Sequence, residues 1–221
     1  MLSKKFNLIV QSKIPSYKKT ISVDSDKSIS IRSLLIGSIC HSISNVRNVL
    51  ESEDIFSTVQ CLKKLGVKID KIKSNNYLIY GKGLGSLKVK KNTELNFGNS
   101  GTLARLLIGI LSTTPNVEVK IKGDRSLNKR SMRNLINEMN KFGATFYPKK
   151  RFNFPLKVVS TVLPIPINYN AGVAAQIKSA VIFAGLNSYG RTKVVESERS
   201  RAHTCLLYTS DAADERSSVD L

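Results

Sequence analysis

The chain has 221 residues, of which 41% are hydrophobic and 23% are charged. This is enough to bury a substantial core in one domain, or in one domain and part of another. No apolar run approaches the ~18 residues of a membrane span, and no small-residue cleavage site follows the first ten residues, so we expect no membrane span and no signal peptide. The three cysteines lack metal-ligand spacing, which predicts reduced thiols in a cytoplasmic protein without a metal site.

The net charge of +19 is compatible with nucleic-acid binding. However, the basic residues are scattered along the chain, apart from small groups such as Lys149-Lys150-Arg151. No zinc-finger, RRM, KH or basic-zipper signature is present. We therefore interpret most of the charge as a lysine-rich solvated surface and predict no nucleic-acid partner. A basic nucleic-acid-binding or structural repeat protein is the alternative from another class.

Five stretches show apolar residues at helical spacing, and seven short β-rich segments lie between them. The helical stretches are 28–41, the stretch from Ser52 to Gly66, the stretch that follows Asn99-Ser100-Gly101-Thr102, the stretch from Met132 to Gly143, and 177–184. The β-rich segments are 44–49, 67–72, 77–80, 117–121, 144–147, 156–159 and 192–195. This alternation predicts a chain of mixed α/β (α+β) class.

These elements repeat along the chain. Leu34-Leu35-Ile36-Gly37 returns as Leu106-Leu107-Ile108-Gly109, and a related Val181-Ile182-Phe183-Ala184-Gly185 follows. Leu65-Gly66 and Phe142-Gly143 end the second helix of two successive repeats. The repeat predicts a βαβαββ unit that is present twice in full, with a third unit that is incomplete.

The last 17 residues, 205–221, differ in composition from the rest of the chain. They contain four acidic residues and one basic residue, and they lack the lysine and isoleucine that dominate the preceding sequence. An ordinary acidic tail is one interpretation. We favour another, a translated sequencing-adapter read-through, and we assign no chemistry to this segment.

Three junctions between a loop and a helix combine residue types that bind anions. The first, Asp26 to Arg32, places Ser28 and Arg32 on one helical face, next to Lys27 and the free N–H groups of the helix start. The alternative for this junction is a plain N-cap at Ser28 and a surface arginine at Arg32.

The second junction, Phe97 to Thr102, contains two glycines beside an amide and hydroxyls, which allows a ligand to approach the main chain. Its alternative is an ordinary glycine-rich turn capped by Ser100 or Thr102. The third junction, Gly123 to Met132, concentrates three cations before a helix. Its alternative is a solvated basic turn, which we favour for Arg125.

Five motifs in order resemble those of the EPSP synthase family, over about residues 5–204. They are Asp26-Lys27-Ser28-Ile29-Ser30 with Arg32, Asn99-Ser100-Gly101-Thr102, the 123–132 loop, Ala174-Ala175-Gln176-Ile177-Lys178-Ser179-Ala180, and Ser200-Arg201-Ala202-His203-Thr204. The resemblance implies transfer of the enolpyruvyl group of phosphoenolpyruvate to shikimate 3-phosphate in aromatic amino-acid (chorismate) biosynthesis, with no metal or organic cofactor. It also implies one lobe of repeated βαβαββ units and a monomer when complete.

The resemblance assigns roles to ten residues. Shikimate 3-phosphate would be bound by Lys27, Ser28, Arg32, Ala174, Ala175, Gln176 and Arg201. Phosphoenolpyruvate would be bound by Lys27, Asn99, Gly101, Arg130 and Gln176. Lys27, which would contact both substrates, is the predicted catalytic residue among them.

Departures from the family pattern concern the hinge and one phosphate contact. Asp24-Ser25 stands where Pro-Gly is usual, and Ala174 stands where many relatives have a serine. The related UDP-N-acetylglucosamine enolpyruvyl transferase is a lesser alternative, because residues 123–132 lack its cysteine. The resemblance implies that residues 1–24 are a strand segment and hinge toward a second lobe, that 25–204 form the substrate-binding lobe, and that without the second lobe this fragment is inactive.

Overall fold

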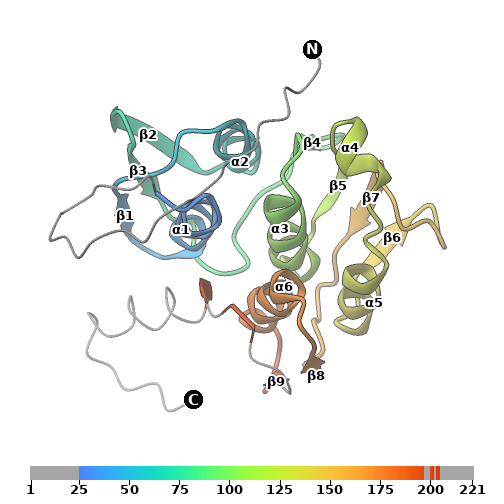
Figure 1. Cartoon of the computed structure of the whole chain (residues 1–221). Helices are drawn as coiled ribbons and strands as arrows, with labels where there is room; N and C mark the ends of the chain where they lie inside the picture. Colours follow the sequence, from blue (N-terminus) through green and yellow to red (C-terminus); the bar gives the residue numbers. More distant parts are fainter. Residues whose placement is uncertain (1–24, 197–199, 202, 205–221) are drawn as a thin grey trace, which may run out of the picture.

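The computed structural model describes residues 25–196, 200, 201, 203 and 204 (Figure 1). The predicted N-terminal strand segment, residues 1–24, and the 205–221 segment lie outside the described residues. Within the described part, no helix is long and apolar enough to cross a membrane.

The second repeat unit is complete and shows the βαβαββ order, with one extra short helix. Its elements are β4 (Glu94–Asn96), α3 (Gly101–Thr113), β5 (Glu118–Lys122), α4 (Arg125–Lys129), α5 (Arg133–Lys141), β6 (Thr145–Tyr147) and β7 (Leu156–Val159). The strands form one sheet in the order β4-β5-β7-β6, in which β4 and β5 are parallel and the other neighbours are antiparallel. The predicted α/β class is confirmed.

The first and third units reproduce parts of the same topology. The first contains α1 (Lys27–Ile39), β1 (Ile43–Val46), α2 (Glu53–Lys64), β2 (Lys68–Lys73) and β3 (Asn76–Tyr80). Its sheet order, β1-β3-β2, matches β5-β7-β6 of the second unit. The third unit contains β8 (Asn168–Ala171), α6 (Ala175–Gly185) and β9 (Lys193–Glu196), with β8 parallel to β9 as β4 is to β5.

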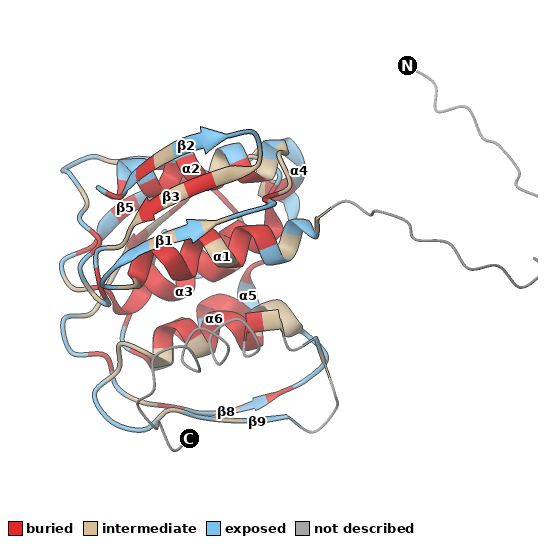
Figure 2. Cartoon of the chain, turned by 90° about the vertical axis from the view of Figure 1, so that its left-hand side faces the viewer, coloured by how far each residue is buried: buried red, intermediate tan, exposed pale blue. Residues whose placement is uncertain are grey.

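The first helix of each unit lies in the middle of the lobe, and the three sheets lie outside (Figures 1 and 2). Accordingly α1, α3 and α6 are buried along most of their length, whereas α2 and α5 bury one face each. The buried side chains form one continuous cluster that runs from Ile31 to Ala184. A helix that is apolar on all sides requires such a central position, which explains why the Leu-Leu-Ile-Gly sequence repeats.

One glycine of this repeated sequence, Gly109, allows two of the central helices to approach each other closely. A Cβ at Gly109 of α3 would lie 2.5 Å from the carbonyl oxygen of Ala180 and 2.9 Å from its Cα, both on α6. Backbone atoms cannot move aside as a flexible side chain can, so only glycine fits here. The contact between α3 and α6 therefore depends on this residue.

Three short elements were not predicted from the sequence, and two predicted details differ. The strands β4 and β8 and the helix α4 have only three to five residues and too few apolar side chains to show a period. The predicted strand 44–49 ends at Val46, since Asn48 takes a positive φ of 56°. Ser52 precedes α2 as predicted, but its side chain makes no capping hydrogen bond.

We predict that Gly109→Ala lowers the free energy of unfolding by roughly 2 kcal/mol, because the new methyl group overpacks the contact between α3 and α6. Urea denaturation measures this loss. Gly172→Ala is the matched control, since nothing lies within 4 Å of a Cβ at Gly172. Equal stability of the two variants would contradict the prediction.

Candidate functional site

Two hydrogen bonds join the three central helices near their N-terminal ends. Arg32 Nη2 of α1 donates to Ser179 Oγ of α6 at 3.3 Å, and Gln176 Nε2 of α6 donates to Thr102 Oγ1 of α3 at 3.0 Å. All four residues lie in the first two turns of their helices. The N-terminal ends of α1, α3 and α6 therefore lie at the same end of the lobe (Figure 2), where their free N–H groups and dipoles favour anions.

The start of α1 is capped by Asp26, whose carboxylate accepts a hydrogen bond from the N–H of Ile29 at 2.7 Å. Ser28 is thus inside the first turn, and the alternative of a plain N-cap at Ser28 is wrong. Lys27 is exposed, and its Nζ lies 3.1 Å from Asp54 Oδ2 at the start of α2. Asp54 therefore holds the ammonium group of Lys27 at this end of the lobe.

Arg32 is only 3% exposed, so the alternative of a surface arginine is also wrong. Its Nε donates to Thr204 Oγ1 at 2.8 Å, and its Nη1 donates to the carbonyl oxygen of Ser28 at 2.9 Å. Burial lowers the pKa of Arg32, Asp26 raises it, and the nearby charge of Arg201 lowers it further. Arg32 and Arg201 are thus two neighbouring cations, one buried and one exposed.

The second and third predicted junctions form one structure. The N–H of Asp124 donates to the carbonyl oxygen of Gly98 at 2.8 Å. The side chain of Asn99 donates to Asp124 Oδ2 at 2.9 Å and accepts from Arg130 Nη2 at 2.8 Å. Asn99 therefore orients Arg130 beside the start of α3, where Ser100 caps the helix by accepting from the N–H of Leu103.

Two guanidinium groups converge on Gly101. A Cβ at Gly101 would lie 2.8 Å from Arg105 Nη1 and 3.1 Å from Arg130 Nη1. Burial, and then the charge of Arg130, lower the pKa of Arg105. Arg105 was not among the site residues predicted from the sequence. The spacing could have identified it, because Arg105 follows Gly101 by four residues, as Arg32 follows Ser28. In the structure, each arginine donates to the carbonyl oxygen four residues before it.

The start of α6 has no side-chain cap, since Ala174 occupies the N-cap position. Ala174 is exposed, and the N–H of the half-buried Ala175 donates to the carbonyl oxygen of Val173 at 3.0 Å. Gln176 is half-buried and, through Thr102, connects this helix start with that of α3.

The predicted site residues thus form two groups at one end of the lobe. The first group gathers at the starts of α1 and α6 and contains Lys27, Ser28, Arg32, Ala174, Ala175, Gln176 and Arg201. The second gathers at the start of α3 and contains Asn99, Gly101 and Arg130. Gln176 connects the two groups, and Arg125 is exposed on α4, which agrees with a solvated turn.

Among the described residues, four arginines at these helix starts form no salt bridge. In the part of the chain that the structure describes, no carboxylate oxygen lies within 4 Å of the guanidinium group of Arg32, Arg105, Arg130 or Arg201. Like charges held together in this way, two of them poorly solvated, are unfavourable until an anion neutralises them. The arrangement can therefore bind two multiply charged anions side by side.

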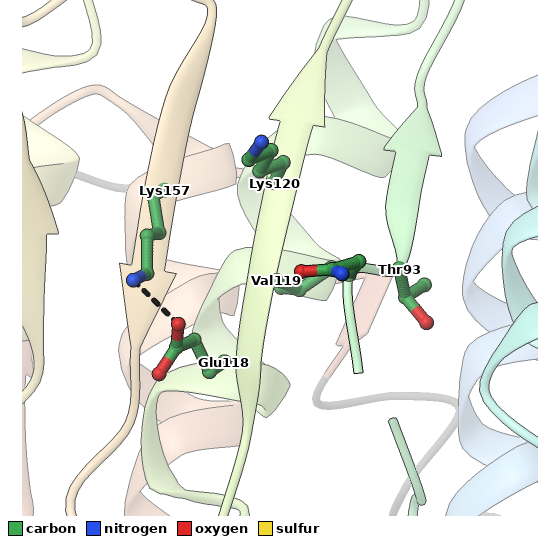
Figure 3. Close-up of a pocket in the computed structure, with 6 residues that line it drawn as sticks. Thr93, Glu118, Val119, Lys120 and Lys157 are labelled. Atoms are coloured by element: carbon green, nitrogen blue, oxygen red, sulfur yellow. Dashed lines mark ion pairs between the residues drawn. The ribbon is translucent and has the colours of Figure 1, made fainter. Parts of the chain in front are cut away.

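A shallow hollow elsewhere on the surface has different properties (Figure 3). It lies on the sheet β4-β5-β7-β6 and is lined by Asn92, Thr93, Glu118, Val119, Lys120 and Lys157. Lys157 Nζ is already paired with Glu118 at 2.5 Å. The hollow adjoins the start of β5, whereas the loops that contain Asn99 and Arg130 follow the ends of β4 and β5, so we do not assign it to the site.

Comparisons with known proteins agree with this geometry. A family model described as EPSP synthase (3-phosphoshikimate 1-carboxyvinyltransferase) matches residues 12–209. Relatives named 3-phosphoshikimate 1-carboxyvinyltransferase include those of Paramagnetospirillum magneticum, 40% identical over 186 residues, and Caldicellulosiruptor saccharolyticus, 42% identical over 196 residues. The matches cover 84% and 88% of this chain but only 41% and 44% of the relatives.

A solved EPSP synthase from Acinetobacter baumannii has a TM-score of 0.77 and 35% identity, covering 83% of this chain and 41% of that chain. The chain thus spans less than half the length of these relatives. Fold and site together define a lobe of repeated βαβαββ units that presents cations at the starts of its central helices. The chain belongs to the EPSP synthase family.

An ion pair beside the site provides a pH-dependent test. Hydrogen bonds from Lys178, and then from Ser200, lower the pKa of Glu196 from 4.5 to about 2. Because the folded pKa lies below the unfolded one, the stabilisation is present above about pH 4.5 and is lost as the pH falls toward 2.

We therefore predict that Glu196→Gln lowers the urea midpoint at neutral pH, and that the difference from the unmodified chain shrinks between pH 4.5 and 2. The same comparison in a Lys178→Met background should show a smaller difference at neutral pH, since the main partner is removed. A difference that stays constant through this range would be evidence against the ion pair.

Proposed function

We propose that this chain is the anion-binding lobe of an enzyme that transfers the enolpyruvyl group of phosphoenolpyruvate to the 5-hydroxyl of shikimate 3-phosphate. The observation that carries the proposal is the pair of cation groups at the helix starts, which Gln176 joins and whose arginines have no carboxylate within 4 Å among the described residues. The reaction brings together two multiply charged anions, and a preorganised set of cations and N–H donors offsets their repulsion. Family membership supports the identity of the two anions.

The first group would bind shikimate 3-phosphate. Arg32 and Arg201 are neighbouring cations suited to one phosphate, and Lys27 and Ser28 stand at the same helix start. Ala174 and Ala175 can contribute only main-chain groups. The N–H of Ala175 must then exchange the carbonyl oxygen of Val173 for the ligand.

The second group would bind phosphoenolpyruvate. Arg130, oriented by Asn99, presents the planar fork that pairs with a carboxylate or phosphate in two places. Gly101 leaves space between the guanidinium groups of Arg130 and Arg105. Gln176, which connects the two groups, and Lys27, at the start of α1, would contact both substrates. Lys27 would also stabilise negative charge during the reaction.

We expect the 221-residue chain to bind substrate without turnover. Its relatives are more than twice as long as the matched region, and the family resemblance assigns the proton-transfer residues to the other lobe. We propose no metal or organic cofactor for the reaction. A cytoplasmic location and a monomeric complete protein also stay predictions.

The alternative of a nucleic-acid-binding protein has less support. Several surface lysines already face carboxylates within 3.4 Å: Lys68, Lys71, Lys122, Lys141 and Lys157. Arg105 and Arg130 instead converge on Gly101, and Arg32 and Arg201 are neighbours, so that a small anion can reach two guanidinium groups at once.

We predict that the 221-residue chain binds shikimate 3-phosphate in isothermal titration calorimetry, and that Arg32→Ala and Lys27→Ala each weaken binding by about tenfold or more. Loss of one charge-assisted hydrogen bond to a phosphate has an effect of this size. Arg191→Ala, at an exposed position, is the control and should bind as the unmodified chain does. Salt-sensitive DNA binding without sugar-phosphate binding would instead favour the alternative function.

We further predict that Arg130→Lys weakens phosphoenolpyruvate binding by about tenfold, since lysine keeps the charge but loses the fork that Asn99 orients. An NMR titration of the chain measures this affinity. Arg125→Lys is the matched control in the same loop, because Arg125 is exposed on α4. Equal effects of the two substitutions would argue against a specific role for Arg130.

A further inference from the structure

Lys178 is a buried cation to which neither the family motifs nor the proposed function assigns a role. It lies on α6, one turn after Ala174, and is 4% exposed. Its Nζ lies 2.8 Å from Glu196 Oε1, and the two side chains are 5% and 30% exposed. A buried ammonium group is costly unless it is paired, so this contact constrains both side chains strongly.

Glu196 also accepts hydrogen bonds from Ser200, the residue before Arg201. It ends β9, and its Oε1 accepts the backbone N–H of Ser200 at 2.7 Å in addition to the Ser200 hydroxyl. One carboxylate oxygen thus receives Lys178 and two groups of Ser200. These donors lower the pKa of Glu196 to about 2.

A second contact holds the chain on the other side of Arg201. Thr204 is 2% exposed, and its Oγ1 accepts from Arg32 Nε and donates to Ser179 Oγ, each at 2.8 Å. Thr204 is therefore bonded directly to Ser179 of α6. Ser200 is connected to the preceding residue, Lys178, through Glu196. Arg201 lies between these two attachments.

This attachment opposes an electrostatic repulsion. Arg201 is close enough to Arg32 to lower the pKa of Arg32, and no carboxylate within the described residues pairs with either guanidinium group. An exposed arginine with a free side chain and backbone would move away from another cation. A fixed backbone next to Arg201 limits this movement.

We propose that Lys178 and Glu196 are positioning residues for Arg201. Their ion pair fixes the backbone at Ser200 and thereby keeps the guanidinium group of Arg201 beside that of Arg32, so that one phosphate can contact both. The inference rests on the proposed function in so far as that phosphate belongs to shikimate 3-phosphate.

The test is a mutant cycle on the affinity of the 221-residue chain for shikimate 3-phosphate. Lys178→Met/Glu196→Met removes both charges at once, which avoids leaving one buried charge without a partner. We expect this double variant and Arg201→Ala each to weaken binding by about tenfold, and the triple variant to be no weaker than Arg201→Ala alone. Independent losses that multiply in the triple variant, or unchanged binding by the double variant, would overturn the proposal.

A second measurement needs no ligand and separates this inference from the proposed function. The amide hydrogen of Ser200 should exchange slowly in the unmodified chain and in Arg201→Ala, and faster in Lys178→Met/Glu196→Met. Lys141→Met/Glu138→Met removes the ion pair of α5 and is the matched control, which should leave this exchange unchanged. Equal exchange in all variants would refute the attachment. Absence of substrate binding with the expected exchange would instead refute the proposed function.

Discussion

The close contact between α3 and α6 at Gly109 is the constraint on which the site depends. The backbones of these helices can approach only because position 109 has no side chain. Close packing of parallel central helices brings their first turns together, so that Gln176 reaches Thr102 across the contact. A wider spacing would separate the cation groups that these turns carry. The packing of the apolar core thus determines how the charged end of the lobe is arranged.

The arginines at the helix starts are in an energetically unfavourable environment, unlike the apolar side chains of the core. Burial and mutual repulsion lower the pKa of Arg32 and of Arg105, and neither arginine has a carboxylate partner in the described part of the chain. Hydrogen bonds to main-chain carbonyl and side-chain hydroxyl oxygens satisfy their N–H groups without neutralising their charge. Such a site is stable only because the surrounding fold holds it, and an anion would relieve the repulsion.

Much of the fold could be predicted from the sequence because the repeat consists of apolar residues at regular spacing. The five predicted helices and the seven predicted strands are all present. The short elements β4, β8 and α4 could not be found, since their sequences contain too few apolar positions to define a period. The cap of α1 was also ambiguous, because Asp26 and Ser28 are both common capping residues and only the structure distinguishes them.

The partners of the site residues were harder to predict than the residues themselves. Arg32 was identified from its motif, but its contacts with Ser179 and Thr204 span 147 and 172 residues of the chain. No local pattern encodes contacts of that range. Arg105 and the ion pair of Lys178 with Glu196 were missed for a related reason, since their importance depends on which groups the fold places beside them.

The common topology of the units has a consequence for how such a site can change. Each unit contributes the first turn of one central helix, and every such turn faces the same end of the lobe. The binding surface is therefore modular: a substitution in one helix start alters one set of ligand contacts, while the other two helix starts keep their own. The groups that one helix start presents can then be changed separately within a single continuous core.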